Sequence, residues 1–323
     1  MPPKRPRFGS LQFWPRKRAA KFLPRVNWRP VVNSKNVSSV KESGLLGMIA
    51  YKAGMVSCIV KDEGANSMTK GKKIVVPATV LEVPPMSVYS VRFMKHGIAL
   101  KDVVVSNDKE LKRFMRTAKS LKPLDSEVPA EYDDVHLLVY SRVSKTGIKK
   151  TPDMFEVAIK GDNKLEMAKQ YISRDLTVKD VLNTGLFDVR GLTKGKGLVG
   201  PVKRFGISLK GHKSEKGVRR PGSLGPWHPA RVTFHTPISG QLGMFTRVHR
   251  NLKFLTSGNA IQNTSINPKA GFTQYGTIRG DYIIVQGSVP GPQKRQMLLT
   301  AAARPTKKLA VRKFTFIEVA QAI

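Results

Sequence analysis

The sequence predicts a mainly β protein with an α/β insertion, a long basic N-terminal tail and a basic loop extension. Short β-like runs from Gly44 onward, beginning with GLLGMIAYKAGM and SCIVKDEG, end at Gly, Pro, Asp or Asn clusters, which is typical of a small antiparallel barrel. Residues 107–186 are richer in Asp and Glu and show helical spacing. Two basic stretches, residues 1–43 and about 190–250, are so rich in Pro or Gly that neither helical nor alternating periodicity survives there.

The charge is the most unusual feature of the composition. The 323 residues include 57 Lys and Arg against 22 Asp and Glu, a formal net charge of +35. Repulsion between these cations opposes compaction, so we expect the chain to bind a polyanion. Nucleic acid is the first candidate and an anionic membrane the second.

Membrane and secretory classes are excluded on the sequence. No uninterrupted apolar stretch approaches the roughly 20 residues that span a bilayer, and the basic start lacks the apolar centre of a signal peptide. The single cysteine, Cys58, excludes an intrachain disulfide and fits a reducing, cytoplasmic compartment. Its apolar neighbours predict a buried thiol rather than a reactive one.

The tail, residues 1–43, is basic and interrupted by prolines, so we expect no persistent helix or strand in it. Aromatic side chains alternate with its cations, which is unusual for a solvated linker. Two interpretations stay open: the aromatics stack on bases while the cations meet phosphates, or they pack onto the protein's own barrel. The tail residues assigned to RNA are Arg5, Arg7, Phe13, Trp14, Arg16, Lys17 and Arg18.

The remaining boundaries follow the change of pattern along the chain. Residues 44–106 are expected to form the first part of the barrel, and residues 187–323 the second part. Between them, residues 107–186 are an insertion in which DKELKRFMRTAKSL and NKLEMAKQYI predict helices, while VHLLVYSRV and DMFEVAIK predict strands. The insertion holds much of the acid and is the region least expected to contact RNA.

The loop at about 190–250 carries the functional argument. Alone it would be disordered, because it can bury almost nothing to offset roughly 1–2 kcal/mol of backbone ordering per residue. RNA would order it, since cations neutralise phosphates and glycines allow close approach of the main chain. The residues assigned to RNA here and in the late turn GSVPGPQKR are Lys194, Lys196, Lys203, Arg204, Lys210, Lys213, Lys216, Arg219, Arg220, Trp227, His228, Arg231, Arg247, Arg250, Lys294 and Arg295.

Trp227 stands between turn-forming residues, with Pro226 before it and Pro229 two positions after it. A large aromatic side chain in such a loop is poorly placed for the protein's own core. We therefore predict that Trp227 points outward and stacks on a nucleotide or wedges between bases.

Signals for catalysis are weak. Residues 195–200 match G-x-G-x-x-G, but the motif needs a strand before it and a helix opening inside it, and Pro201 and Gly206 follow instead. The histidines in and near the loop, at positions 212, 228, 235 and 249, lack the cysteines or clustered carboxylates of a metal site. We expect no enzyme activity, cofactor, metal or small-molecule substrate. An rRNA-modifying enzyme and a chromatin-type DNA-binding protein remain the alternatives.

Several motifs occur in an order that resembles one family, the universal large-subunit ribosomal protein L-three, of archaeal type. These motifs, between about residues 8 and 304, are FGSLQFWPRKRA, GMIAYKAGM, TKGKGLVGPVKRFG, GSLGPWHPARV, GQLGMFTRVHRN and GSVPGPQKR. The resemblance implies a six-stranded translation-protein-type barrel, early binding to large-subunit rRNA, neighbouring large-subunit ribosomal proteins as partners, no homo-oligomer, and a cytoplasmic place in the ribosome.

The resemblance also implies where in the ribosome the loop lies. It implies that residues 190–250 reach toward the peptidyl transferase centre, with Trp227 at the tip on the A-site side, and that the tail from Pro2 to Pro30 threads rRNA. One position departs from the family: Glu215 stands where eukaryotic members carry a modified histidine, and His212 is three residues out of register.

Overall fold

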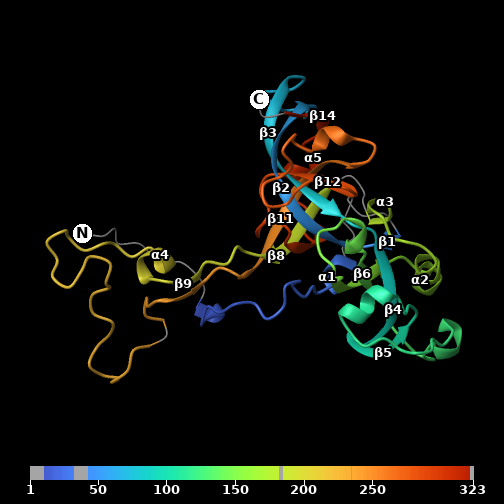
Figure 1. The fold of residues 1–323 in the computed structure, drawn as a ribbon, viewed down its shortest axis with the longest axis horizontal. Coiled ribbons are helices and arrows are strands. Elements are labelled where there is room, and N and C mark those ends of the chain that lie inside the picture. Colours follow the sequence, from blue (N-terminus) through green and yellow to red (C-terminus); the bar gives the residue numbers. More distant parts are fainter. Residues whose placement is uncertain (1–10, 33–42, 182–184, 234, 321–323) are drawn as a thin grey trace. The chain divides into compact units, whose positions relative to one another are not determined.

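The computed structural model describes residues 11–32, 43–181, 185–233 and 235–320 (Figure 1). The chain divides into two compact units, which are described separately below. The extension unit comprises Met1–Lys21 and Leu192–Arg247. The globular unit comprises Phe22–Gly191 and Val248–Ile323. Among the described residues, no helix is both long and apolar enough to cross a bilayer.

A seven-stranded antiparallel sheet forms one part of the globular unit, in the order β13-β8-β11-β12-β3-β2-β14, and β13 also pairs with β2. Its strands are β2 (Gly47–Asp62), β3 (Lys73–Val83), β8 (Leu186–Leu192), β11 (Thr246–Asn259), β12 (Asp281–Gln286), β13 (Gln296–Ala301) and β14 (Phe314–Ala320). Strand β2 is long enough to pair with β13 near its start, with β14 near its end, and with β3 along most of its length.

The sequence pattern divided β2 into two runs, and the structure joins them. The register with β3 shifts between Lys52 and Gly54. A Cβ atom on Gly54 would lie only 2.5 Å from the ring of Phe272, so the glycine lets that ring pack against the strand. Gly54, which the sequence pattern places at the end of a strand, is therefore a site of close packing inside one continuous strand.

A five-stranded sheet, in the order β1-β7-β6-β4-β5, forms the second part of the globular unit. Its strands are β1 (Gly44–Leu45), β4 (Met86–Lys95), β5 (Ile98–Val104), β6 (Asp134–Ser141) and β7 (Met154–Lys160). Helices α2 (Lys164–Ile172) and α3 (Val178–Val181) follow β7. Strands β4 and β5 fall within residues 44–106, which were predicted to form the first part of the barrel. Instead, β4 pairs with β5 on one side and β6 on the other, which suits a strand buried along most of its length.

The local predictions in the insertion have mixed outcomes. The helix expected in NKLEMAKQYI is confirmed as α2, and the two expected strands are confirmed as β6 and β7. The helix expected in DKELKRFMRTAKSL is wrong, because only the 3₁₀ turn η2 (Lys109–Arg113) forms there. In this stretch Leu111 is fully buried and Met115 is partly buried. Two such side chains can hold about one turn against the protein, but they do not form the apolar face of an amphipathic helix.

The tail contains two short turns where no regular structure was expected, η1 (Leu11–Phe13) and α1 (Arg29–Val32). Trp28, just before α1, is only 5 % exposed and meets Phe155 edge-on, with ring centroids 6.4 Å apart. This tail aromatic therefore packs into the globular core, as the second interpretation of the tail required. Cys58 is fully buried, as predicted.

Candidate nucleic-acid interface

The extension unit is built on a two-stranded ribbon of β9 (Gly197–Val199) and β10 (Gly240–Leu242), followed after β9 by the short helix α4 (Pro201–Phe205). Pro201 occupies the first turn of α4, where its fixed φ suits the helix, and Gly206 ends it in the left-handed region at φ 68°. Gly243 follows β10 at φ 80°, and a Cβ atom there would lie 2.1 Å from the carbonyl oxygen of Lys194. Only glycine fits this crossing of the two chain segments.

The structure corrects the expectation that no helix follows the G-x-G-x-x-G match at residues 195–200. A strand and a helix do occur, but β9 lies inside the motif and α4 is a single turn. The partner of β9 is the antiparallel β10, so no βαβ unit forms. The dinucleotide interpretation still fails, for a different reason from the one expected.

Trp14 of the tail packs against the loop within the extension unit. Its ring stacks on Phe205, with centroids 5.6 Å apart and planes 6° from parallel, and meets His235 edge-on. The Arg16 guanidinium lies 5.1 Å from the centres of both the Trp14 and Phe205 rings. The backbone N–H of Ala19 donates to the Met244 carbonyl at 2.9 Å. The Trp14 indole thus has a third role, beyond the two interpretations of the tail aromatics, in which it packs against the loop.

Arg204, which was assigned to RNA, uses its guanidinium inside the extension unit. Its Nη1 donates to the Ile238 carbonyl at 3.0 Å and its Nε to the Gln241 carbonyl at 3.2 Å. The group also lies 5.0 Å from the Phe205 ring centre. Burial, with a smaller contribution from nearby Arg16, lowers the pKa of Arg204. Arg204 therefore holds the start of the loop against β10.

Most of the other assigned side chains in the extension unit face solvent. The exposed ones are Phe13, Lys17, Arg18, Lys194, Lys196, Lys203, Lys210, Lys213, Lys216, Arg219, Arg220, His228, Arg231 and Arg247. Trp227 is 86 % exposed, the outward position that its neighbours predicted. Nearby turns are closed by hydrogen bonds, such as the one from the Arg231 N–H to the Pro229 carbonyl at 2.7 Å.

The remaining assigned residues lie in the globular unit or outside the described residues. Arg250 on β11 and Lys294 are exposed, and Lys294 has a left-handed φ of 61°. Arg295 is half-buried, with its guanidinium 4.7 Å from the centre of the Phe22 ring. Arg5 and Arg7 fall in residues 1–10, which the structure does not describe.

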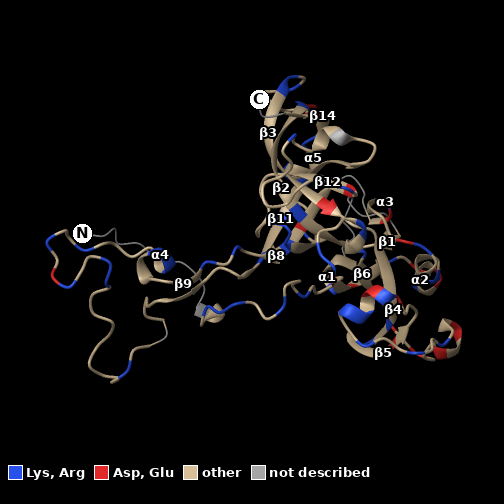
Figure 2. Ribbon diagram, viewed as in Figure 1, with Lys and Arg blue, Asp and Glu red and all other residues tan. Residues whose placement is uncertain are grey.

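Charge is distributed unequally between the two units (Figure 2). Residues 192–247 contain eleven Lys and Arg and a single acid, Glu215. Within the described part of this segment, no ion pair forms between a cation and a carboxylate. Ion pairs are instead concentrated between Arg92 and Asp180, inside the five-stranded sheet and its connections. The cations of the loop are therefore unneutralised.

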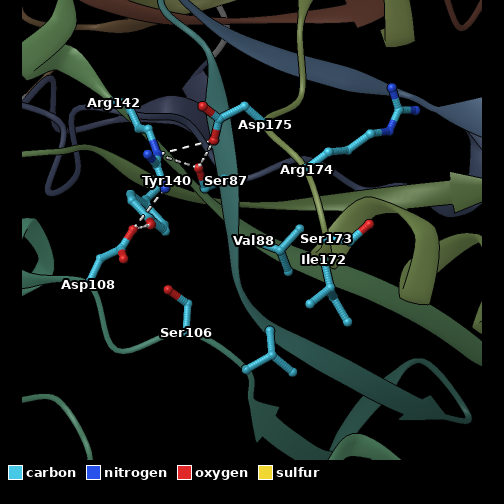
Figure 3. A pocket seen from close by; sticks show the side chains of 11 residues that line it. Ser87, Val88, Ser106, Asp108, Tyr140, Arg142, Ile172, Ser173, Arg174 and Asp175 are labelled. Atoms are coloured by element: carbon cyan, nitrogen blue, oxygen red, sulfur yellow. Dashed lines mark hydrogen bonds and ion pairs between the residues drawn. The ribbon is translucent and has the colours of Figure 1, made fainter.

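The globular unit has a surface cavity of about 380 Å³ beside β4 and β6 (Figure 3). Arg142 spans it, with its Nη2 3.1 Å from Asp108 and its Nε 3.2 Å from Asp175 and 2.6 Å from the Ser87 hydroxyl. The charged groups of this cavity thus neutralise one another. Among the described residues, no cluster of three His, Cys, Asp or Glu is arranged to hold a metal.

Comparison with known proteins identifies the family of the chain that carries this basic extension. The model of the family "Ribosomal protein L3" matches residues 1–320. The chain belongs to the ribosomal protein L3 family. It is a structural component of the large ribosomal subunit rather than an enzyme, which confirms the function expected from the sequence. The comparisons do not support an rRNA-modifying enzyme or a DNA-binding protein.

Curated archaeal relatives agree along nearly the whole chain, and each carries the name large ribosomal subunit protein uL3. The protein of Methanothermobacter thermautotrophicus is 38 % identical, covering 94 % of this chain and 93 % of its own. That of Pyrobaculum calidifontis is 39 % identical over the same shares. That of Methanococcus vannielii is 36 % identical, covering 98 % and 97 %.

Proposed function

We propose that residues 190–250 and the tail penetrate large-subunit rRNA and that the exposed cations of both segments neutralise phosphates there. The observation that carries the proposal is the eleven Lys and Arg of residues 192–247 against one Glu, with no ion pair among the described residues of that segment. Unneutralised cations on an irregular chain gain free energy by releasing counterions from a nucleic acid. Arg204 and Trp14 act differently from the others, since their contacts set the position of the loop.

Trp227 is proposed to act at the tip, on the A-site side of the peptidyl transferase centre, as the family resemblance implies. Its 86 % exposure leaves most of the ring open to a nucleobase. The loop then shapes a catalytic RNA and carries out no chemistry itself. Contacts by the rest of the protein would support early subunit assembly and meet neighbouring ribosomal proteins, with the chain present as a single copy.

The division into a barrel and an insertion is proposed with boundaries that differ from those expected from the sequence. Pairing of β13 with both β8 and β2 supports a barrel closed by six strands, to which β14 adds at β2. Residues 44–83 and 187–323 would supply this barrel and carry the loop. The five-stranded sheet, with β4 and β5 included, would be the inserted α/β region.

Binding to large-subunit rRNA as a function of salt tests the electrostatic part. If ten or more phosphates are contacted, the log–log slope should be on the order of −9, at roughly −0.9 per contact for B-DNA. A slope near zero would contradict the proposal. Equal affinity for duplex DNA would favour a DNA-binding protein, because contacts to RNA shape and 2′-hydroxyls should favour structured RNA.

Replacement of the tip side chain tests the second part. Trp227→Ala should leave rRNA binding nearly intact but alter tRNA accommodation or sensitivity to A-site antibiotics. Leu224→Ala is the matched control, since it removes a partly exposed apolar side chain three residues away. Unchanged behaviour of Trp227→Ala in both functional assays would remove the role proposed for the tip.

A further inference from the structure

A second group of unpaired cations lies in the inserted sheet region, where the sequence led us to expect the least contact with RNA. We define the cationic ridge as the five exposed basic residues on and just after η2: Lys109, Lys112, Arg113, Arg116 and Lys119. Among the described residues, none of the five forms an ion pair with a carboxylate. Arg113 instead donates to the backbone carbonyl of Lys150 at 3.2 Å, which fixes its position on the surface.

The acidic side chains of the same short segment are held by partners in and just after β6, although that of Asp108 stays 42 % exposed. Asp108 accepts a hydrogen bond from the Tyr140 hydroxyl and lies 3.1 Å from the Arg142 guanidinium (Figure 3). Glu110 accepts from the Ser144 hydroxyl at 2.5 Å, and its second oxygen is buried. Both acids of the segment are therefore occupied by partners other than the ridge cations.

The ridge is held in a defined conformation. Leu111 is fully buried with Tyr140, and Met115 packs partly against the same cluster. The N–H groups of Phe114 and Met115 both donate to the Leu111 carbonyl, at 2.8 and 2.9 Å. This anchored turn leaves Phe114 51 % exposed between Arg113 and Arg116. An exposed aromatic between two cations can stack on a base or pack on a ribose while its neighbours meet phosphates.

Other lysines of the same region show that this lack of pairing is not general. Lys95 pairs with Glu131 at 2.5 Å, Lys122 with Glu127 at 2.8 Å, and Lys169 with Asp125. Carboxylates are thus available in the insertion, yet none neutralises the ridge among the described residues. A dense polyanion supplied from outside would remove the repulsion between the five cations.

We propose that the cationic ridge is a second rRNA-binding surface, which contacts the phosphate backbone through its five cations and a nucleoside through Phe114. The inference rests on the ribosomal function proposed above and adds a site outside both the tail and the loop. RNA is favoured over an acidic protein segment because the ridge combines several cations with an exposed aromatic ring, the combination used on single-stranded or looped RNA.

Salt-dependent binding of the full chain to its large-subunit rRNA tests the ridge. The variant Lys109→Gln/Lys112→Gln/Arg116→Gln should make the log–log slope shallower by about 2 to 3, at roughly 0.9 per lost contact. The control Lys95→Gln/Lys122→Gln/Lys169→Gln removes the same charge from lysines already paired with carboxylates and should leave the slope unchanged. Phe114→Ala should weaken binding several-fold without changing the slope.

A tethered probe identifies the partner directly. Because the one native cysteine is buried, Ser120→Cys offers a single reactive thiol beside the ridge for an iron chelate that generates hydroxyl radicals. In reconstituted subunits this chelate should cut rRNA at defined positions. Uncut rRNA, cross-linking of the ridge to an acidic protein segment, or equal slopes for the two triple variants would overturn the proposal. A flat salt dependence of the unmodified chain would refute the proposed function itself, and the ridge with it.

Discussion

At the scale of single residues, His136 links the stability of the globular unit to pH. It is buried on β6, with Nδ1 2.7 Å from Glu156 and Nε2 3.6 Å from Asp134. Burial alone would lower its pKa, but hydrogen bonds to Asp134 and Glu156 outweigh burial, so the pKa of His136 is raised. The free energy that this raised pKa contributes is fully present below the unfolded-state pKa. It is lost as pH rises through the folded-state pKa.

His136→Gln should therefore destabilise the protein more in weak acid than in weak base. We expect a loss of roughly 1–3 kcal/mol at about pH 5.5, where the lowered pKa values of Asp134 and Glu156 keep both carboxyls ionised, and a smaller loss at about pH 9. Urea unfolding at the two pH values measures the difference. His96→Gln is the control, because that side chain is 81 % exposed. An equal loss at both pH values would contradict a change in the charge of His136 between them.

Gly243 is the residue on which the crossing at the base of the loop depends. Gly243→Ala would place a methyl group 2.1 Å from the Lys194 carbonyl and would force alanine to a φ of 80°. The backbone cost alone is about 1–2 kcal/mol, so the Lys196 amide, which donates to Leu242 at 3.0 Å, should exchange its hydrogen about tenfold faster or more. Gly211→Ala, a change in open space, should leave that exchange rate unchanged.

At the scale of elements, the stack between the tail and α4 orders the extension unit. Such aromatic pairs contribute about 0.5–1.5 kcal/mol beyond their buried area. Trp14→Ala should raise the exchange rate of the Ala19 amide, which donates to Met244, by up to about tenfold. Phe13→Ala, beside it but 78 % exposed, serves as the control. Equal exchange in the two variants would show that the tail docks without the stack.

The elements also show which parts of the fold the sequence pattern can predict. Helix α2 and strands β6 and β7 were predictable, because the apolar residues that each element buries follow a regular spacing or a short run within that element's own sequence. The composition of residues 190–250 likewise predicted an irregular basic loop with an exposed Trp227. The partner of β4 was not predictable, since pairing with β6 depends on residues about fifty positions away. The same holds for Trp14 and Phe205, whose contact no local periodicity encodes.

At the scale of the whole molecule, folding and RNA recognition rest on different parts of the chain. The buried apolar side chains lie almost entirely in the globular unit, and Leu192 and Pro201 are the two members of the described extension unit among them. Residues 207–237 therefore add charge without adding core. Arg204 Nη1 donates to the Ile238 carbonyl at 3.0 Å, so the two ends of this segment lie close enough for a short linker to join them.

Replacing residues 207–237 with a short Gly-Ser linker should consequently leave the unfolding free energy of the globular unit within about 0.5 kcal/mol of the full chain. The salt slope of rRNA binding should become shallower by about 5 if the six cations removed each contact a phosphate. Those cations are Lys210, Lys213, Lys216, Arg219, Arg220 and Arg231. The matched control keeps the loop at full length and changes the same six to Gln, which should reproduce the shallower slope. A large fall in unfolding free energy on truncation would show that the loop supports the core, contrary to the absence of buried apolar side chains in its described residues.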